Sequence, residues 1–254
     1  MSSFQELVEM MSRLRGKGGC PWDKKQTHET IKPYLIEEAY EVVETIDRKD
    51  DERLQEELGD LLLQVLFHAQ IAREEGRFDI EGVIEKNIAK LRRRHPHVFG
   101  DVKVKGAEEV LTNWEKIKRS EGGKSLLDGV PPNLPALLRA QRIQEKAARA
   151  GFDWERPDEV MRKIEEEFAE FKKAYSQKNP EQVEEELGDI IFSFVNLGRF
   201  LGICLEDALR KTVNRFDTRF RFIESKLEKL GKDPKEVSLD EMNTLWEKAK
   251  EEVG

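Results

Sequence analysis

Acidic residues at repeated spacings are the side chains in this sequence best suited to chemistry. The pentapeptide EELGD occurs at residues 56–60 and again at residues 185–189, and an E-x-x-E motif precedes each copy. Carboxylates three residues apart lie on one face of a helix. If each set of motifs converges, it makes a four-carboxylate cage that can hold a divalent cation. The two quartets are Glu38, Glu41, Glu57 and Asp60, and Glu167, Glu170, Glu186 and Asp189.

Converging carboxylates need a cation because they repel one another. Two charges about 6 Å apart repel by roughly 3 kcal/mol at an effective dielectric constant near 20, and a whole domain is stabilised by only about 5–15 kcal/mol. The alternative places these acids on solvated helix faces, which would not explain the duplicated spacing or the glycines Gly59 and Gly188. A glycine inside a helix costs about 1 kcal/mol relative to alanine. We therefore expect each glycine to let a neighbouring backbone or a ligand approach closely.

The ligand atoms indicate which metal is bound. Oxygen-only sites favour Mg²⁺, with Mn²⁺ as a possible substitute, over zinc. Helical di-iron cages use a Glu-x-x-His motif, and no histidine in this sequence follows a glutamate by three residues. Magnesium held by carboxylates commonly accompanies a substrate that carries phosphates.

Basic and aromatic residues are then expected to bind that substrate. Arginine and lysine bind phosphate oxygens, and tryptophan can stack on a base, although any single one of these residues can equally form surface ion pairs or pack in a core. The candidates are Arg93, Arg94, Trp114, Lys118, Lys163, Arg215, Arg219, Trp246 and Lys250.

The elements that position these residues belong to a tandem repeat. A shift of 129 residues carries Glu38 onto Glu167 and Glu57 onto Glu186 without a gap. Apolar residues recur at helical spacing around the motifs and alternating strand patterns are absent, so the expected fold class is all-α. Each unit should contain a helical hairpin that turns near residue 49 or residue 178, the midpoints between the paired acids.

The domain boundaries follow from the repeat and from composition. Residues 120–135 read SEGGKSLLDGVPPNLP, and their glycine and proline content predicts a linker. We expect a first unit at residues 1–119 and a second at residues 136–254. A two-helix hairpin cannot enclose its own apolar face, so protomers are expected to pair into a homodimer that buries the LLLQVLF and IIFSFV segments.

Composition narrows the class of protein. The net charge of −8 argues against a nucleic-acid-binding protein. No apolar run approaches the roughly 20 residues of a membrane span, so neither nucleic acid nor membrane is expected as a partner. The two cysteines, Cys20 and Cys204, indicate neither a disulfide framework nor a thiolate zinc site, and they suit a cytoplasmic location.

Several segments resemble the MazG family of nucleoside triphosphate pyrophosphohydrolases in its duplicated, two-domain form. The core motif of that family is E-x-x-E, a spacer and E-x-x-D, and both copies are complete here. The resemblance covers nearly the whole chain. Its segments are GGCPWDKKQTH, EEAYEVVETI, EELGDLLLQVLFHAQIA, RRRHPHVFGDV, NWEKIK, GFDWE and EELGDIIFSFVNLGR.

The resemblance implies an all-α fold in which hairpins from two protomers form a four-helix bundle core. It also implies Mg²⁺-dependent hydrolysis between the α- and β-phosphates, which yields a nucleoside monophosphate and pyrophosphate. The two quartets match the family's metal ligands, and Glu37 and Glu166 beside them would serve as base or as support for the ligands. The family's Asn-x-Lys-Phe segment reads Val213-Asn214-Arg215-Phe216 here, so Val213 replaces the amide.

Three functions follow as alternatives. The leading expectation is an enzyme that hydrolyses ribo- and deoxyribonucleoside triphosphates with broad base tolerance and so cleans the nucleotide pool. The others are a hydrolase specialised for one nucleotide, such as dUTP or a histidine-pathway nucleotide, and a non-catalytic protein that senses nucleotides. Because both quartets are intact, we expect both units to bind metal and the first to contribute measurable hydrolysis. His68, on an apolar helix face, is expected to be a satisfied core residue and no ligand.

Overall fold

The structure is a computed structural model that describes residues 2–121 and 125–253. All regular structure in these described residues is helical, which confirms the all-α prediction. The chain divides into two compact units, Met1–Ile117 and Lys118–Gly254. The predicted linker at 120–135 lies partly outside the described residues, and its exact boundaries stay a prediction.

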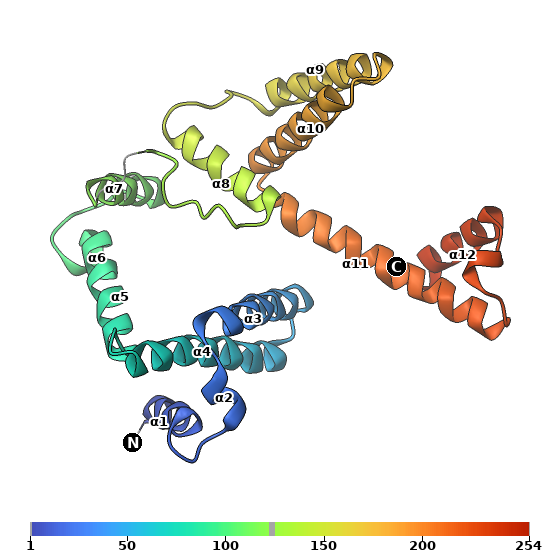
Figure 1. Cartoon of the computed structure of the whole chain (residues 1–254). Coiled ribbons are helices and arrows are strands. Elements are labelled where there is room, and N and C mark those ends of the chain that lie inside the picture. The colour runs from blue at the N-terminus through green and yellow to red at the C-terminus, as the bar shows by residue number, and fades with distance from the viewer. Residues whose placement is uncertain (1, 122–124, 254) are drawn as a thin grey trace. The chain divides into compact units, whose positions relative to one another are not determined.

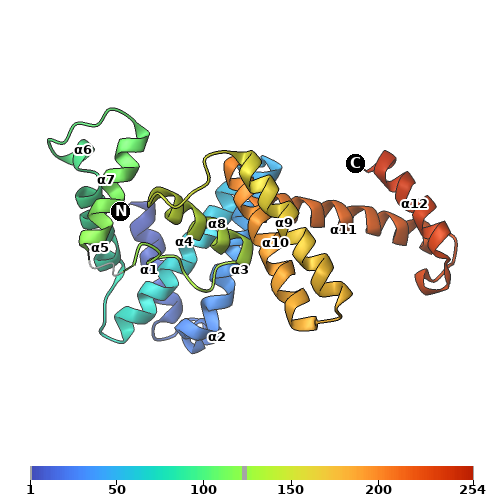
Figure 2. The same cartoon turned by 90° about the horizontal axis from the view of Figure 1, so that it is seen from above.

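The first unit is built around an antiparallel hairpin of two long helices, α3 and α4, which lie side by side in Figures 1 and 2. Helix α1 packs against α4, and α5 follows α4 after a short turn. The helices are α1 (Ser3–Arg15), α2 (Pro21–Lys25), α3 (His28–Arg48), α4 (Asp51–Glu74), α5 (Ile80–Arg94), α6 (Pro96–Phe99) and α7 (Ala107–Ser120), the last of which crosses the division between the units.

The second unit repeats this plan with the hairpin of α9 and α10, against which α8 packs. Helix α11 leaves the hairpin, and α12 packs against α11 (Figure 1). No single helix of the described residues is long and apolar enough to cross a membrane, although α10 and α11 together pass that test with a bend of 106° between them. The elements are α8 (Ala136–Arg149), α9 (Pro157–Ser176), α10 (Pro180–Phe200), α11 (Leu205–Lys229), the 3-10 helix η1 (Pro234–Glu236) and α12 (Leu239–Glu252).

The two hairpins turn where the sequence predicts. Lys49 and Lys178 separate the paired helices, and both adopt a left-handed backbone conformation. The next residue in each turn caps the following helix: the side chain of Asp50 accepts a hydrogen bond from the Arg53 amide, and that of Asn179 accepts one from the Gln182 amide. Matching turns and caps give the two hairpins the same register, which sets the acidic residues of facing helices level with one another.

Each hairpin buries only part of its apolar surface within the chain. In the first unit the core contains Met11, Ile31, Phe67 and Ile71 from α1, α3 and α4. On the other side of α4, the side chains of Leu58, Leu62 and Val65 are exposed, and α10 exposes its own apolar row. That row comprises Leu187, Ile191 and Phe194, and Phe192 is exposed to one side of it. These faces are available to a second copy of the chain, and dimerisation itself stays a prediction.

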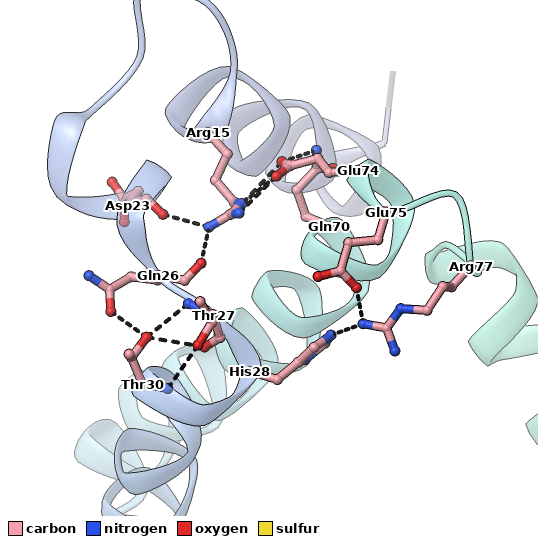
Figure 3. Close-up of polar contacts among 10 residues, drawn as sticks. All are labelled: Arg15, Asp23, Gln26, Thr27, His28, Thr30, Gln70, Glu74, Glu75 and Arg77. Carbon is pink, nitrogen blue, oxygen red and sulfur yellow. Dashed lines mark hydrogen bonds and ion pairs between the residues drawn. The ribbon is translucent and has the colours of Figure 1, made fainter.

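A buried arginine ties the first two helices to the hairpin (Figure 3). The side chain of Arg15 is 5% exposed; it forms an ion pair with Glu74 on α4 at 2.7 Å and donates to the carbonyl oxygens of Asp23 and Gln26. Its guanidinium also lies 5.3 Å from the centre of the Phe67 ring. One side chain thus joins α1, the segment around α2 and the far end of α4.

Candidate metal centres

The first unit brings three of its four predicted ligands into one cluster. Carboxylate oxygens of Glu38 and Glu41 on α3 and of Glu57 on α4 all lie within 4.8 Å of one another. Asp60 is outside this tight group, but its charge acts on Glu38. The hairpin register therefore gathers the E-x-x-E and E-x-x-D motifs of this unit at one place.

The second unit gathers a slightly different set of three. Oxygens of Glu167 on α9 and of Glu186 and Asp189 on α10 lie within 4.8 Å of one another. Glu170 is outside that group and exposed, yet its charge acts on Glu186. The metal-binding role of all eight acids stays a prediction, which this geometry supports.

Burial and mutual repulsion both act on these carboxylates. Glu57 is 7% exposed and Glu167 is 6% exposed, which is unusual for glutamate. Burial, helped by the charges of Asp60 and Glu41, raises the pKa of Glu38 against the opposing effect of a hydrogen bond from Gln64. Desolvation and the like charges around it also raise the pKa of Glu186. A raised pKa means that each cluster resists full ionisation until a positive charge arrives.

A basic side chain contacts the cluster in each unit, but from positions that do not correspond: the second helix of the hairpin in the first unit and the first helix in the second unit. In the first unit Arg53 on α4 pairs with Glu57 at 3.1 Å. In the second unit Lys163 on α9 lies 2.9 Å from both Glu167 and Glu166, and these hydrogen bonds raise the pKa of Lys163. Sequence reasoning overlooked Arg53, although its position one turn before Glu57 was a usable signal.

The donor set fits a hard divalent cation. All candidate ligand atoms are carboxylate oxygens, which Mg²⁺ and Mn²⁺ prefer. Opposite ligands of an octahedral magnesium ion are about 4.2 Å apart, since each bond is about 2.1 Å. The carboxylate oxygens of each cluster, which all lie within 4.8 Å of one another, are therefore near enough to share one such cation after small side-chain movements.

The glycines of the two EELGD motifs leave open space beside the clusters. A methyl group added at Gly59 or Gly188 would meet no atom within 4 Å apart from the nearby backbone of its own helix. The expected close approach of a neighbouring backbone is therefore wrong within one chain, because α3 and α9 lie too far from these positions. Close approach by a ligand or by a second copy stays a prediction.

The remaining predicted residues beside the ligands have separate surroundings. Glu37 on α3 is exposed, and Glu166 on α9 is exposed and held by Lys163. Glu38 accepts a hydrogen bond from the Gln64 amide at 3.3 Å. Gln64 was not predicted from the sequence, and it stands one turn after Asp60 on the same helix.

The predicted phosphate-binding residues of the first half lie beyond the α3–α4 hairpin. Arg93 and Arg94 end α5, and the Arg94 guanidinium lies 5.4 Å from the ring centre of Trp114 on α7. Lys118 falls on the second unit's side of the division. Their contact with substrate stays a prediction.

The corresponding residues of the second unit lie on α11 and α12, outside the α9–α10 hairpin (Figure 1). The Arg219 guanidinium lies 5.6 Å from the ring centre of Trp246, and the Phe216 ring lies 5.2 Å from it. Arg215 and Lys250 are exposed on the same two helices. The cation and the aromatic ring are paired as a phosphate-and-base site would require, and that role stays a prediction.

A pocket beside the second cluster was missed by sequence reasoning. It has a volume of about 690 Å³, and its lining includes Lys163, which contacts Glu167 of the cluster, Glu166, which pairs with Lys163, and the half-exposed ring of Trp154. Trp154 lies in the GFDWE segment just before α9, and Asp153 in the same segment is bound by Arg199 of α10. The sequence did offer a signal for this pocket, because GFDWE stands directly before the helix that carries the second E-x-x-E motif.

The prediction that His68 is a satisfied core histidine is only half right. Its Nδ1 lies 2.7 Å from Nδ1 of His28, but its Nε2 is buried without a hydrogen-bond partner among the described residues. Burial, together with the charge of His28, lowers the pKa of His68. The apolar helix face does bury the ring, but it supplies no acceptor for the second nitrogen.

Comparison with known proteins gives matches over the whole chain. A family model described as the MazG nucleotide pyrophosphohydrolase domain matches twice, at residues 26–99 and 155–221. A Thermotoga maritima protein named nucleoside triphosphate pyrophosphohydrolase/pyrophosphatase MazG is 52% identical over 250 residues, which cover 97% of this chain and 95% of that protein. The nucleoside triphosphate pyrophosphohydrolase of Escherichia coli K12 is 45% identical over 98% of both chains. The uncharacterized protein YabN of Bacillus subtilis is 48% identical over 98% of this chain and 51% of its own length.

Proposed function

This chain belongs to the MazG family of nucleotide pyrophosphohydrolases, and from that premise we propose that it is a Mg²⁺-dependent nucleoside triphosphate pyrophosphohydrolase. It cleaves ribo- and deoxyribonucleoside triphosphates between the α- and β-phosphates and releases a nucleoside monophosphate and pyrophosphate. The observation that carries this proposal is the duplicated carboxylate cluster. In both units it combines a buried glutamate, an oxygen-only donor set and an adjacent basic side chain.

The cofactor expected at each cluster is Mg²⁺, with Mn²⁺ as a substitute. Such a cation, when bound, orients a triphosphate, offsets its charge and lowers the pKa of a water molecule. In the first unit Glu38, Glu41, Glu57 and Asp60 would hold it, and in the second the matching quartet would do so. Carboxylates with raised pKa values gain most from the arriving charge, since it relieves their mutual repulsion.

Side chains beside the ligands have three tasks in this proposal. Arg53 and Lys163 bind cluster carboxylates in the free protein and can turn to phosphate oxygens once a cation satisfies those carboxylates. Glu37 and Glu166 are exposed acids next to the ligands and can accept a proton at a carboxylate oxygen from the attacking water. Trp154, on the pocket beside the second cluster, can stack on a base in addition to the predicted Trp114 and Trp246.

The acting form is a homodimer. The exposed apolar rows of α4 and α10 cover a surface that a second hairpin can bury, which would make the four-helix core. A second copy could also bring basic residues of α5, α11 and α12 to a cluster that the same chain does not place them against. A monomer by light scattering at micromolar concentration would contradict this part of the proposal.

Product analysis tests the activity. The protein is incubated with each ribo- and deoxyribonucleoside triphosphate in Mg²⁺, in Mn²⁺ and in EDTA, and the products are separated by anion exchange. Monophosphate and pyrophosphate from all triphosphates, and none in EDTA, is the result expected for a cytoplasmic enzyme that cleans the nucleotide pool. Pyrophosphate from one nucleotide alone would show a specialised hydrolase, and no turnover with measurable binding would show a nucleotide sensor.

A further inference from the structure

Two groups of polar side chains lie along the interface between α3 and α4 of the first unit, one near the end of α4 and one at the metal cluster. Figure 3 shows part of the group near the end of α4, where Glu75 pairs with Arg77 and Arg77 Nη2 lies 2.5 Å from Nε2 of His28, at the start of α3. His28 Nδ1 lies 2.7 Å from Nδ1 of His68, and the two rings are stacked with centres 5.0 Å apart. At the metal cluster, Gln64 donates to Glu38 Oε1 at 3.3 Å.

The direction of donation within the group near the end of α4 follows from Arg77. Arginine can only donate, so His28 Nε2 must accept from Arg77. The neutral His28 ring then carries its proton on Nδ1 and donates it to His68 Nδ1. His68 in turn carries its proton on Nε2, because a neutral imidazole has one N–H and one acceptor nitrogen.

Two polar side-chain atoms of α4 remain to be paired. His68 Nε2 and Gln64 Oε1 are both buried without a hydrogen-bond partner among the described residues. The two residues are one helical turn apart, and both reach α3, so their side chains share the interface between the hairpin helices. The first atom is a donor and the second an acceptor. An unpaired buried polar group costs about 1–3 kcal/mol, so a water molecule that bridges the two atoms is favourable.

We propose that Gln64 is a positioning residue for Glu38 and that His68, held in one tautomer by His28 and Arg77, fixes the orientation of the Gln64 amide. The proposal rests on the proposed function, in which Glu38 binds metal. Only one orientation of the amide presents N–H to the Glu38 carboxylate, because the reversed amide would set an oxygen against it. A donor from His68 at Oε1 selects the useful orientation. Groups outside the first ligands commonly tune metal sites in this way.

The second unit lacks this arrangement, which makes it an internal comparison. The positions that match Gln64 and His68 after the shift of 129 residues are Ser193 and Leu197. Ser193 is buried and too short to copy the glutamine, and leucine has no donor. The E-x-x-E glutamate of the first cluster is therefore held by an amide, whereas its counterpart Glu167 is held by the ammonium of Lys163.

The test measures Mn²⁺ binding to the first cluster of the full chain. The parent for all variants carries Glu167→Gln and Glu170→Gln, so that only the first cluster binds tightly, and free Mn²⁺ is followed by electron paramagnetic resonance. Gln64→Met, which keeps the volume but removes the amide, should weaken Mn²⁺ binding by about 10-fold to 100-fold. Gln64→Ser, the second unit's own residue, should do the same if the methionine variant fails to fold. His68→Phe should weaken binding about tenfold, and His68→Gln should restore it because glutamine returns an N–H donor.

Each outcome of the Mn²⁺-binding measurements supports or contradicts one part of the proposal. Melting temperature in EDTA separates a folding defect from a metal-binding defect, since a purely structural role would lower it without changing the affinity of the folded protein. If the parent binds Mn²⁺ and both Gln64 variants bind it equally well, the positioning role is wrong while the proposed function stands. If His68→Gln binds no better than His68→Phe, the role of the histidine is wrong. If the parent binds no Mn²⁺, the proposed function fails and this proposal fails with it.

Discussion

Lys49 and Lys178 hold the same left-handed backbone conformation, with φ of 55° and 53°, at turns 129 residues apart in the sequence. They are the non-glycine residues with positive φ in the part of the chain that the structure describes. Each turn sets the register of one hairpin and so decides which carboxylates of the facing helices become level. The strained position is thus repeated together with the site that it aligns.

Replacing these lysines by glycine should stabilise the protein. The left-handed conformation costs an ordinary residue roughly 1–2 kcal/mol, and glycine avoids that cost but loses more chain entropy on folding. For Lys49→Gly and Lys178→Gly we expect a net gain of about 0.5 kcal/mol each, measured by urea denaturation. Lys49→Ala is the control and should give no gain, because alanine keeps the strained Cβ. A glycine variant less stable than the alanine variant would contradict the prediction.

Both clusters should contribute to activity, the first measurably. Glu38→Gln with Glu41→Gln should remove most turnover at the first cluster, and Glu167→Gln with Glu170→Gln should remove most at the second, because the remaining acids cannot hold the cation in the required geometry. Pyrophosphate release by each double variant measures the other unit alone. If the first pair leaves the rate untouched while the second abolishes it, the amino-terminal unit is structural and the prediction is wrong.

Alanine at the motif glycines should raise stability and lower activity. No atom of the chain obstructs a methyl group at Gly59 or Gly188, so alanine should gain up to about 1 kcal/mol of helix propensity. The same methyl group would fill space reserved for substrate or a second copy. Gln55→Ala, an exposed substitution in α4, is the matched control and should change neither quantity much. An alanine variant with full turnover and an unchanged dimer would show that the open space has no function.

Acid should weaken the attachment of α1 and α2 to the hairpin. Burial alone would raise the pKa of Glu74, but its hydrogen bonds from Arg15 and Gln70 outweigh that effect and lower the pKa below the ordinary value of 4.5. The stabilisation is therefore present above pH 4.5 and is lost as pH falls through the lower folded-state pKa. Glu74→Gln should be less stable than the parent at pH 7, and the difference should shrink at lower pH in urea denaturation. Glu85→Gln, an exposed control on α5, should show no such convergence.

Spacing within one helix and repetition between halves were enough to predict the hairpins, their turns and the convergence of the acids. These features depend on helix periodicity, which the sequence carries directly. The contacts of Arg15 with Glu74 and of His28 with His68 join residues 59 and 40 positions apart. No local pattern encodes such pairs, because they depend on how helices pack. For the same reason the sequence grouped Trp114 and Trp246 with the clusters, while the structure places them on helices outside the hairpins.

The basic side chain that contacts each cluster comes from a different helix of the hairpin, which shows how the two copies of the repeat have diverged. Gln182 stands where the second unit would need a copy of Arg53, and Tyr34 stands where the first would need a copy of Lys163. Each unit thus offsets the charge of its carboxylates with a basic residue at a position of its own. A metal ion that binds would compete for the carboxylates with a different basic group at each cluster: a guanidinium from α4 in the first and an ammonium from α9 in the second. One polypeptide therefore carries two carboxylate clusters whose charge balance can change independently.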